Sequence, residues 1–170
     1  MNPKQITIIL FSFLLLSYAG FGQKIEFSNV CVFLPEKKNV QLQKAVQVLR
    51  EVINERTNIL LPLLDKAMPA GKQIIAVGVE GRMDKFPEYC KTAVMKLPET
   101  GKEGYKIILI ENSTVIIAGH DERGAMYGIG WLLRKMEMMN GMVKFYLHGL
   151  AVRMMVAKAN VVPRLPKSGS

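Results

Sequence analysis

The stretch from 119 to 136 holds the residue types in this chain best suited to chemistry, and two kinds of site could be built from it. Its triplet from His120 to Glu122 offers the imidazole and carboxylate groups that bind metals or transfer protons. Its Gly128-x-Gly130 pair is part of the pattern that lets a backbone approach nucleotide phosphates. Each site requires a particular spacing, and the spacing argues against both.

A zinc site of the His-Glu-x-x-His type needs two imidazoles one helical turn apart on one face of a helix. Here Asp121 follows His120, and Gly124 occupies the position of the second ligand. The other histidine, His148, lies far downstream. We therefore expect no metal site and no cofactor.

A dinucleotide site needs its glycines in the turn between a strand and a helix. Gly128 and Gly130 instead fall inside a helical pattern, and the third glycine of the fingerprint is missing. Gly124 and Gly128 are one turn apart, so we expect them to let this helix pack closely against a sheet.

The stretch is better explained as a capped helix from Glu122 to about Met139. Asp121 is placed to accept hydrogen bonds from the free N–H groups of the first turn, and Glu122 favours the positive end of the helix dipole. Asn140-Gly141 is typical of a helix C-terminus. Apolar residues at helical spacing form one face: Ala125, Met126, Ile129, Leu132, Leu133 and Met136.

Three residues of this helix, Arg123, Tyr127 and Trp131, are candidates for an interface. The two aromatic residues are one turn apart beside the apolar stripe, and such side chains present a large area with a polar group. Burial or contact with another domain is the role that we expect. A sugar-binding patch is the alternative.

Earlier in the chain, the pattern predicts a strand and a second helix. The apolar run from Ile25 to Leu34 is β-type and is followed by Pro35. Apolar residues then recur at helical spacing from Leu42 to Ile53. Asn39 is placed to cap this helix, which we expect to end near residue 56.

Further strands and a short helix are predicted between these two helices. The runs 58–61 and 73–79 are strand candidates, and a short helix is expected around 89–95. Two apolar runs, 105–110 and 115–119, are joined by a polar turn and predict a β-hairpin. The order of elements is roughly β-α-β-β-β-β-α.

Residues 1–22 have the pattern of a secretory signal peptide. Lys4 precedes an apolar run from Ile6 to Leu16, and small residues follow, with cleavage expected after Ala19 or Gly22. The run is shorter than the roughly 20 residues that cross a bilayer. We expect an exported protein, periplasmic or secreted, with no membrane attachment after cleavage.

The formal charge of +9 does not indicate nucleic-acid binding. Between Lys24 and Glu137 there are 17 basic and 14 acidic residues, and the five basic residues after Glu137 are accompanied by no acid. The excess of positive charge thus lies mostly in the tail, without a basic stripe in the body.

Cys31 and Cys90 either pair in an oxidising compartment or are separate buried residues.

The segment from Glu103 to Met136 resembles part of a known domain family. It has Glu103-Gly104-Tyr105 opening a strand, a hairpin, Asp121-x-Arg123-Gly124, then Tyr127-Gly128 and a leucine-rich helix end. This order is similar to the small N-terminal domain before the catalytic barrel of bacterial family-20 β-N-acetylhexosaminidases and of α-glucuronidases. The resemblance covers about 25–139 and is weaker over its first half.

The resemblance implies an α+β fold, with two helices on one face of a mixed β-sheet. It also implies a non-catalytic accessory domain, spanning 24–141, that packs against a (β/α)₈ barrel. The catalytic carboxylates of that family lie in the barrel, so no catalytic residue carries over. The parent protein would be a glycoside hydrolase, and this chain alone would be inactive.

The segment 142–170 departs from the family pattern. It lacks acidic residues and is rich in Val and Met, where a linker to a barrel is expected. We expect a poorly packed tail produced by truncation or a frame shift, and a divergent native tail is the alternative.

Two other functions compete with a severed accessory domain. One is a stand-alone glycan-binding or protein-interaction module that uses Tyr127 and Trp131. The other is an enzyme, which would need a facing pair of carboxylates. Asp121 and Glu122 are adjacent in sequence and do not meet that requirement.

Overall fold

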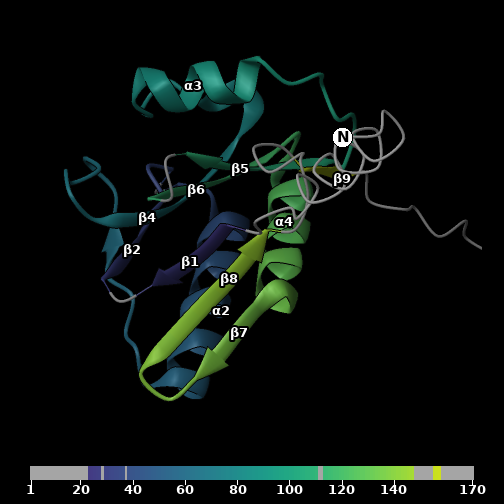
Figure 1. The fold of residues 1–170 in the computed structure, drawn as a ribbon. Coiled ribbons are helices and arrows are strands. Elements are labelled where there is room, and N and C mark those ends of the chain that lie inside the picture. The colour runs from purple at the N-terminus through teal and green to yellow at the C-terminus, as the bar shows by residue number, and fades with distance from the viewer. Residues whose placement is uncertain (1–22, 28, 37, 111–112, 148–154, 158–170) are drawn as a thin grey trace, which may run out of the picture.

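A six-stranded mixed sheet is the centre of the fold (Figure 1). The structure is a computed structural model that describes residues 23–27, 29–36, 38–110, 113–147 and 155–157. In spatial order the sheet contains β3 (Leu63–Leu64), β2 (Val30–Phe33), β4 (Gln73–Val79), β6 (Thr114–Gly119), β5 (Tyr105–Ile110) and β9 (Met155–Ala157).

Four neighbouring strands of this sheet are parallel. β2 pairs in parallel with both β3 and β4, and β4 pairs in parallel with β6. β5 and β6 form the predicted antiparallel hairpin, with Tyr105 opposite Gly119. β9 pairs antiparallel with β5 at the edge.

Helices cover both faces of the sheet. α2 (Val40–Thr57) and α4 (Glu122–Lys135) lie on one face, and α3 (Glu88–Met95) lies on the other (Figure 1). In β2, Val32 faces the α2–α4 core whereas Cys31 and Phe33 face the core beneath α3. Strands buried on both faces require continuous apolar runs, which is what the sequence contains. The predicted α+β fold with two helices on one face is confirmed, and the short helix expected around 89–95 is α3, on the opposite face.

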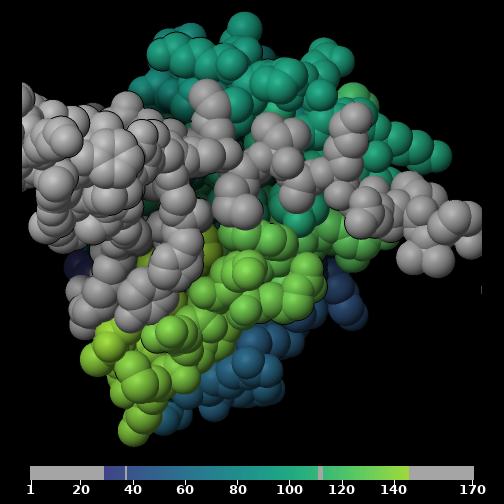
Figure 2. Space-filling model, turned by 45° about the vertical axis from the view of Figure 1, so that its right-hand side comes forward, coloured from purple at the N-terminus to yellow at the C-terminus, as the bar shows by residue number. Residues whose placement is uncertain are grey.

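A second, three-stranded antiparallel sheet covers α2 and α4 from the outside. Its order is β1 (Gln23–Phe27), β8 (Met142–Leu147) and β7 (Met136–Met139). Val143 and Phe145 of β8 are buried in the same core as the two helices. In the space-filling view α4 and the β7–β8 hairpin lie side by side over α2 (Figure 2).

The second sheet corrects three sequence-based expectations. The apolar run 25–34 is two strands, β1 and β2, in different sheets. α4 ends at Lys135, because residues 136–139 alternate between buried or half-buried and exposed positions as a strand does. Asn140-Gly141 is therefore the turn of the β7–β8 hairpin, with Gly141 at a φ of +71°, and not a helix stop.

The expected poorly packed tail is wrong for residues 142–147, because β8 is paired on both sides and carries buried side chains. The predicted strand at 58–61 is also wrong. Asn58 ends α2 in the left-handed conformation, and the short strand β3 follows at Leu63–Leu64. The predicted signal peptide and the segments 148–154 and 158–170 lie outside the described residues.

Cys31 and Cys90 are free and buried in the core between the sheet and α3. Burial raises the pKa of the Cys90 thiol to about 11. The pKa of the Cys31 thiol is also raised, mainly by burial. Both residues therefore act as small apolar core residues and stay protonated at neutral pH.

Lys106 and Glu80 form a buried ion pair on the side of the sheet that α3 covers, and the sequence does not indicate it. The side chain of Lys106 is 2% exposed, and its Nζ lies 3.0 Å from Glu80 Oε2. The same ammonium donates to the carbonyl oxygens of Val94 and Leu97, each at 3.2 Å. Lys106 thus ties β5 to the end of α3 and to the 3-10 turn Glu80–Arg82.

We expect Glu80→Ala to lower the free energy of unfolding by about 3–5 kcal/mol, because it leaves the Lys106 charge buried without a counter-charge. Urea denaturation measures the loss. The double variant Glu80→Ala/Lys106→Met should recover part of it, since both charges are then absent. Equal stability of Glu80→Ala and the wild type would show that the pair does not hold this face.

Candidate functional site

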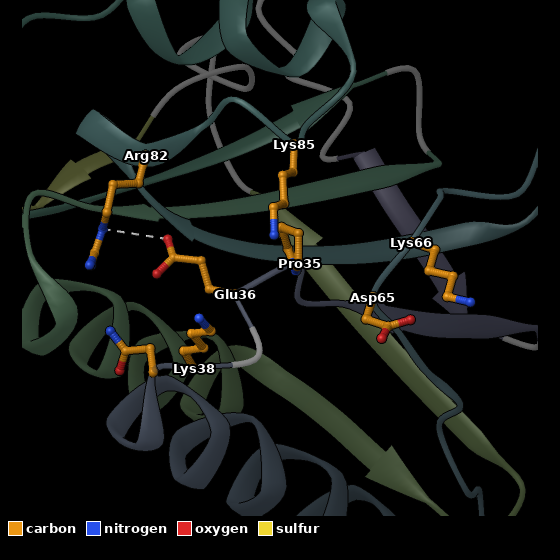
Figure 3. A pocket seen from close by; sticks show the side chains of 8 residues that line it. Pro35, Glu36, Lys38, Asp65, Lys66, Arg82 and Lys85 are labelled. Atoms are coloured by element: carbon orange, nitrogen blue, oxygen red, sulfur yellow. Dashed lines mark ion pairs between the residues drawn. The ribbon is translucent and has the colours of Figure 1, made fainter.

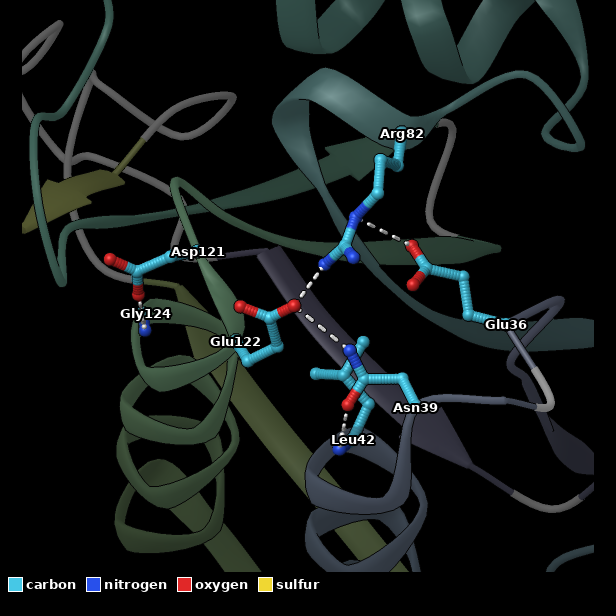
Figure 4. A network of polar contacts seen from close by, with 7 residues as sticks. All are labelled: Glu36, Asn39, Leu42, Arg82, Asp121, Glu122 and Gly124. Carbon is cyan, nitrogen blue, oxygen red and sulfur yellow. Dashed lines mark hydrogen bonds and ion pairs between the residues drawn. The ribbon is translucent and has the colours of Figure 1, made fainter.

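Asp121 anchors the start of α4 through both of its carboxylate oxygens. Oδ1 accepts from the N–H of Gly124 at 2.8 Å, which caps the helix (Figure 4). Oδ2 accepts from the N–H of Glu103 at 2.9 Å. Glu103 has a φ of +60°, so this bond also holds an unfavourable turn before β5.

The pKa values of Asp121 and Glu122 are both lowered. Burial raises the pKa of Asp121, but the N–H groups of Gly124 and Glu103 outweigh it. The pKa of Glu122 is lowered by its own backbone N–H and by the Arg82 guanidinium. Both groups are therefore ionised at neutral pH and accept hydrogen bonds. A general acid needs the opposite shift.

Glu122 joins the N-termini of the two long helices. Asn39 caps α2 by accepting from the N–H of Leu42 at 3.1 Å, and its side-chain amide donates to Glu122 Oε1 at 2.9 Å (Figure 4). Arg82 donates to the same oxygen and lies 3.5 Å from Glu36 Oε1 through its Nε. One polar network thus connects the ends of β2 and β4 to α2 and α4.

A hollow of about 590 Å³ lies next to this network, where β2, β3 and β4 end (Figure 3). We call it the Arg82 hollow. Its lining residues are Pro35, Glu36, Lys38, Asn39, Asp65, Lys66, Arg82 and Lys85. Ligands of open parallel sheets bind outside the carboxyl ends of the strands. No sequence motif marks this site, because its residues come from three separate connections.

The structure separates the three predicted interface residues. Tyr127 is 46% exposed, and Arg123 is exposed and paired with Glu103 Oε1 at 2.9 Å. Trp131 is half-buried and meets the Phe145 ring edge-on, with centroids 6.2 Å apart. Trp131 therefore packs α4 against β8, whereas Arg123 and Tyr127 face outward.

Tyr127 and Arg123 line a groove of about 380 Å³ between α2 and α4, which we call the α2–α4 groove. Its other lining residues are Val40, Gln41, Lys44 and Met126. Val40 is 74% exposed and Met126 is 42% exposed, so large apolar side chains face the solvent here. Trp131 is not among the lining residues.

Gly124 and Gly128 lie where α4 approaches the sheet most closely. A Cβ on Gly124 would lie 2.1 Å from the Gly104 carbonyl oxygen, and one on Gly128 would lie 2.5 Å from Ile117 Cγ2. A side chain at either position would push the helix off the β5–β6 hairpin.

The described part of the chain contains no group of three or more His, Cys, Asp or Glu residues placed to hold a metal ion. His148 lies outside that part. Among the described helices, none is both long and apolar enough to cross a membrane.

No protein-family model and no curated protein matches the chain. Solved structures do match. The glycoside hydrolase CpGH84B matches 81% of this chain and 20% of its own, with 11% identity and a TM-score of 0.52. An inactive mutant of the GH20 exo-β-N-acetylglucosaminidase from Vibrio harveyi matches 82% of this chain and 17% of its own, with 12% identity and a TM-score of 0.48.

A further match is BtGH115A, a GH115 4-O-methyl-α-glucuronidase, over 65% of this chain and 14% of its own, at 15% identity and a TM-score of 0.47. This chain thus spans at most 20% of these three proteins' length. Its fold is one that occurs within larger glycoside hydrolases.

We expect Asp121→Ala to lower the free energy of unfolding by about 0.5–2 kcal/mol, because two N–H donors lose their acceptor. Asp121→Asn keeps an acceptor oxygen and should lose less. Denaturation curves at several pH values measure both. Because the folded pKa lies below its ordinary value of 3.8, the carboxylate stabilises above that value. The contribution of the Asp121 carboxylate to the free energy of unfolding should disappear as the pH falls through the folded pKa. A stability difference between the wild type and Asp121→Ala that does not change with pH would contradict this.

The close approach of α4 predicts opposite effects at two glycines of one helix. Gly128→Ala should destabilise by about 1–3 kcal/mol through overpacking against Ile117. Gly130→Ala is the matched control, because its Cβ would meet only the flexible end of Arg134 at 3.4 Å. Alanine there should stabilise the helix by up to about 1 kcal/mol. Equal denaturation midpoints for the two variants would refute the packing account.

Proposed function

We propose that this chain is the non-catalytic N-terminal domain of an exported glycoside hydrolase of the β-hexosaminidase or α-glucuronidase type, with a catalytic (β/α)₈ barrel as its partner. The shared fold carries the proposal, since 81% of this chain corresponds to 20% of CpGH84B. A domain that fills a fifth of a large hydrolase leaves the chemistry to the remainder of that protein.

The two acidic residues at the start of α4 support a non-catalytic role. Glycosidases place two carboxyl groups on either side of the scissile bond, and one of them must hold a proton. Asp121 is bound to two backbone N–H groups, and Glu122 is bound to Arg82 and Asn39. Both carboxyl groups have lowered pKa values, so neither is prepared to protonate a leaving group.

The α2–α4 groove is our candidate for the surface that meets the barrel. Val40, Met126 and Tyr127 are large apolar residues that line this groove and are exposed to solvent. Exposed apolar groups that lie together on a protein mark interaction sites. Arg123, Gln41 and Lys44 give this surface a polar rim, as interfaces commonly have.

A glycan-binding module is the second candidate, because Tyr127 offers an exposed ring beside the polar side chains of Gln41 and Arg123. In that case the groove would hold a sugar and not a protein surface. Titration of the chain with oligosaccharides separates the two functions, since only a glycan-binding module loses affinity with Tyr127→Ala.

Activity assays test the non-catalytic role directly. We expect no hydrolysis of aryl N-acetylglucosaminides or aryl glucuronides by the purified chain. A reaction above that of a heat-inactivated sample, and lost in Glu122→Gln, would contradict the proposal and assign catalysis to this domain.

We expect the uncovered α2–α4 groove to cause self-association of the isolated chain. The double variant Met126→Glu/Tyr127→Glu should weaken it, because charged side chains oppose burial of this surface. Met95→Glu is the matched control, since Met95 is 81% exposed on α3, across the sheet. Sedimentation velocity over a range of concentrations measures the effect. Equal association of both variants would remove the groove as the docking surface.

A further inference from the structure

We propose that the Arg82 hollow binds a small polar ligand through an oxyanion group, either a carboxylate or a sulfate or phosphate ester. This site is separate from the α2–α4 groove and does not depend on the proposed barrel. With about 590 Å³, it falls in the size range of small-molecule sites.

The charges of the hollow favour an anion. Its lining contains four cationic residues, Lys38, Lys66, Arg82 and Lys85, against two acidic ones, Glu36 and Asp65. The excess within the lining is therefore two positive charges, and Glu122, which pairs with Arg82 from outside the lining, reduces it to one. Lys38 and Lys85 extend toward the loop at Pro35 from opposite sides, whereas Lys66 extends outward (Figure 3).

Arg82 supplies a donor that is already held in position. Its Nη2 donates to Glu122 and its Nε lies 3.5 Å from Glu36 Oε1, and these two ion pairs orient the guanidinium group. Nη1 has no hydrogen-bond partner among the residues that the structure describes, and the side chain is 46% exposed. A fixed guanidinium group with free N–H groups is well suited to bind a planar carboxylate or a sulfate.

The start of α2 adds to the positive potential of the hollow. Asn39, the cap of this 18-residue helix, lines the hollow, and the first turn of α2 contains no acidic residue. The positive end of its dipole is therefore not neutralised within the helix. At α4, in contrast, Glu122 occupies the first turn. Glu122 also accepts from the Asn39 amide at 2.9 Å, so its negative charge lies close to both helix ends.

The ligand class follows from these groups. A single oxyanion with hydroxyl groups around it would use the cations for its charge and the Glu36 carboxylate, whose Oε1 has no hydrogen-bond partner among the described residues, for a hydroxyl group. An acidic monosaccharide or a similar hydroxy acid has this chemistry. A neutral sugar lacks the charge, and Pro35 is the one apolar residue among the residues that line the hollow.

Isothermal titration calorimetry of the full chain tests this inference with four probes: glucuronate, glucose 6-sulfate, inorganic sulfate and glucose. We expect both acidic sugars to bind, glucose not to bind, and the affinity to fall when NaCl is raised. Inorganic sulfate binding as tightly as the sugars would support the oxyanion site and show that only charge is recognised. Tight binding of glucose would overturn the proposal.

Variants locate the binding. Lys85→Gln and Lys38→Gln should each weaken glucuronate binding by about tenfold, because each removes one charge-assisted contact. Lys102→Gln removes an exposed lysine outside the hollow and should leave the affinity unchanged. If all three variants bind as the wild type does, or if no anion binds at all, the hollow is not an anion site. Failure of the barrel proposal would leave these results unaffected.

Discussion

The arrangement of this domain depends on the direct contact between α4 and the β5–β6 hairpin. Gly124 and Gly128 allow it, since a Cβ at either position would lie within 2.5 Å of the hairpin or of the loop before it. Asp121 fixes the position of α4 along its axis, because its carboxylate accepts hydrogen bonds both from the first turn of α4 and from the loop before β5. Once α4 is set, Glu122 meets Asn39 and Arg82, Trp131 meets Phe145, and Tyr127 is left facing outward.

The sequence predicted those features that are local. Helical spacing of apolar residues, an aspartate at the helix start and two apolar runs around a polar turn identified α2, α4 and the β5–β6 hairpin. The strand β4 was also predicted, from its unbroken apolar run. Its side chains are buried on both faces of the sheet, so polar residues do not interrupt the run. The α+β class was implied by the family resemblance of the segment from Glu103 to Met136.

The features that sequence could not predict are those set by distant partners. The residues of β7, Met136–Met139, were expected to continue the preceding helix. A run of four residues is too short to distinguish the helical spacing of apolar residues from the alternation of a strand. The pairing with β8 decides in favour of a strand. Lys106 lies in an apolar strand and gave no signal that Glu80 would neutralise it. The charged residues of the Arg82 hollow are far apart in sequence and belong to no motif. They lie together because they follow β3, β2 and β4, which are neighbours in the sheet.

The central claim is that this fold serves as the accessory part of a glycoside hydrolase whose chemistry lies elsewhere. Sequencing the genomic DNA beyond the codon for Ser170 tests it most directly. We predict that one of the three reading frames, within roughly the next 250 codons, encodes a (β/α)₈ barrel with a pair of acidic residues at the carboxyl ends of its strands. A downstream region that encodes no such barrel in any frame would contradict the account.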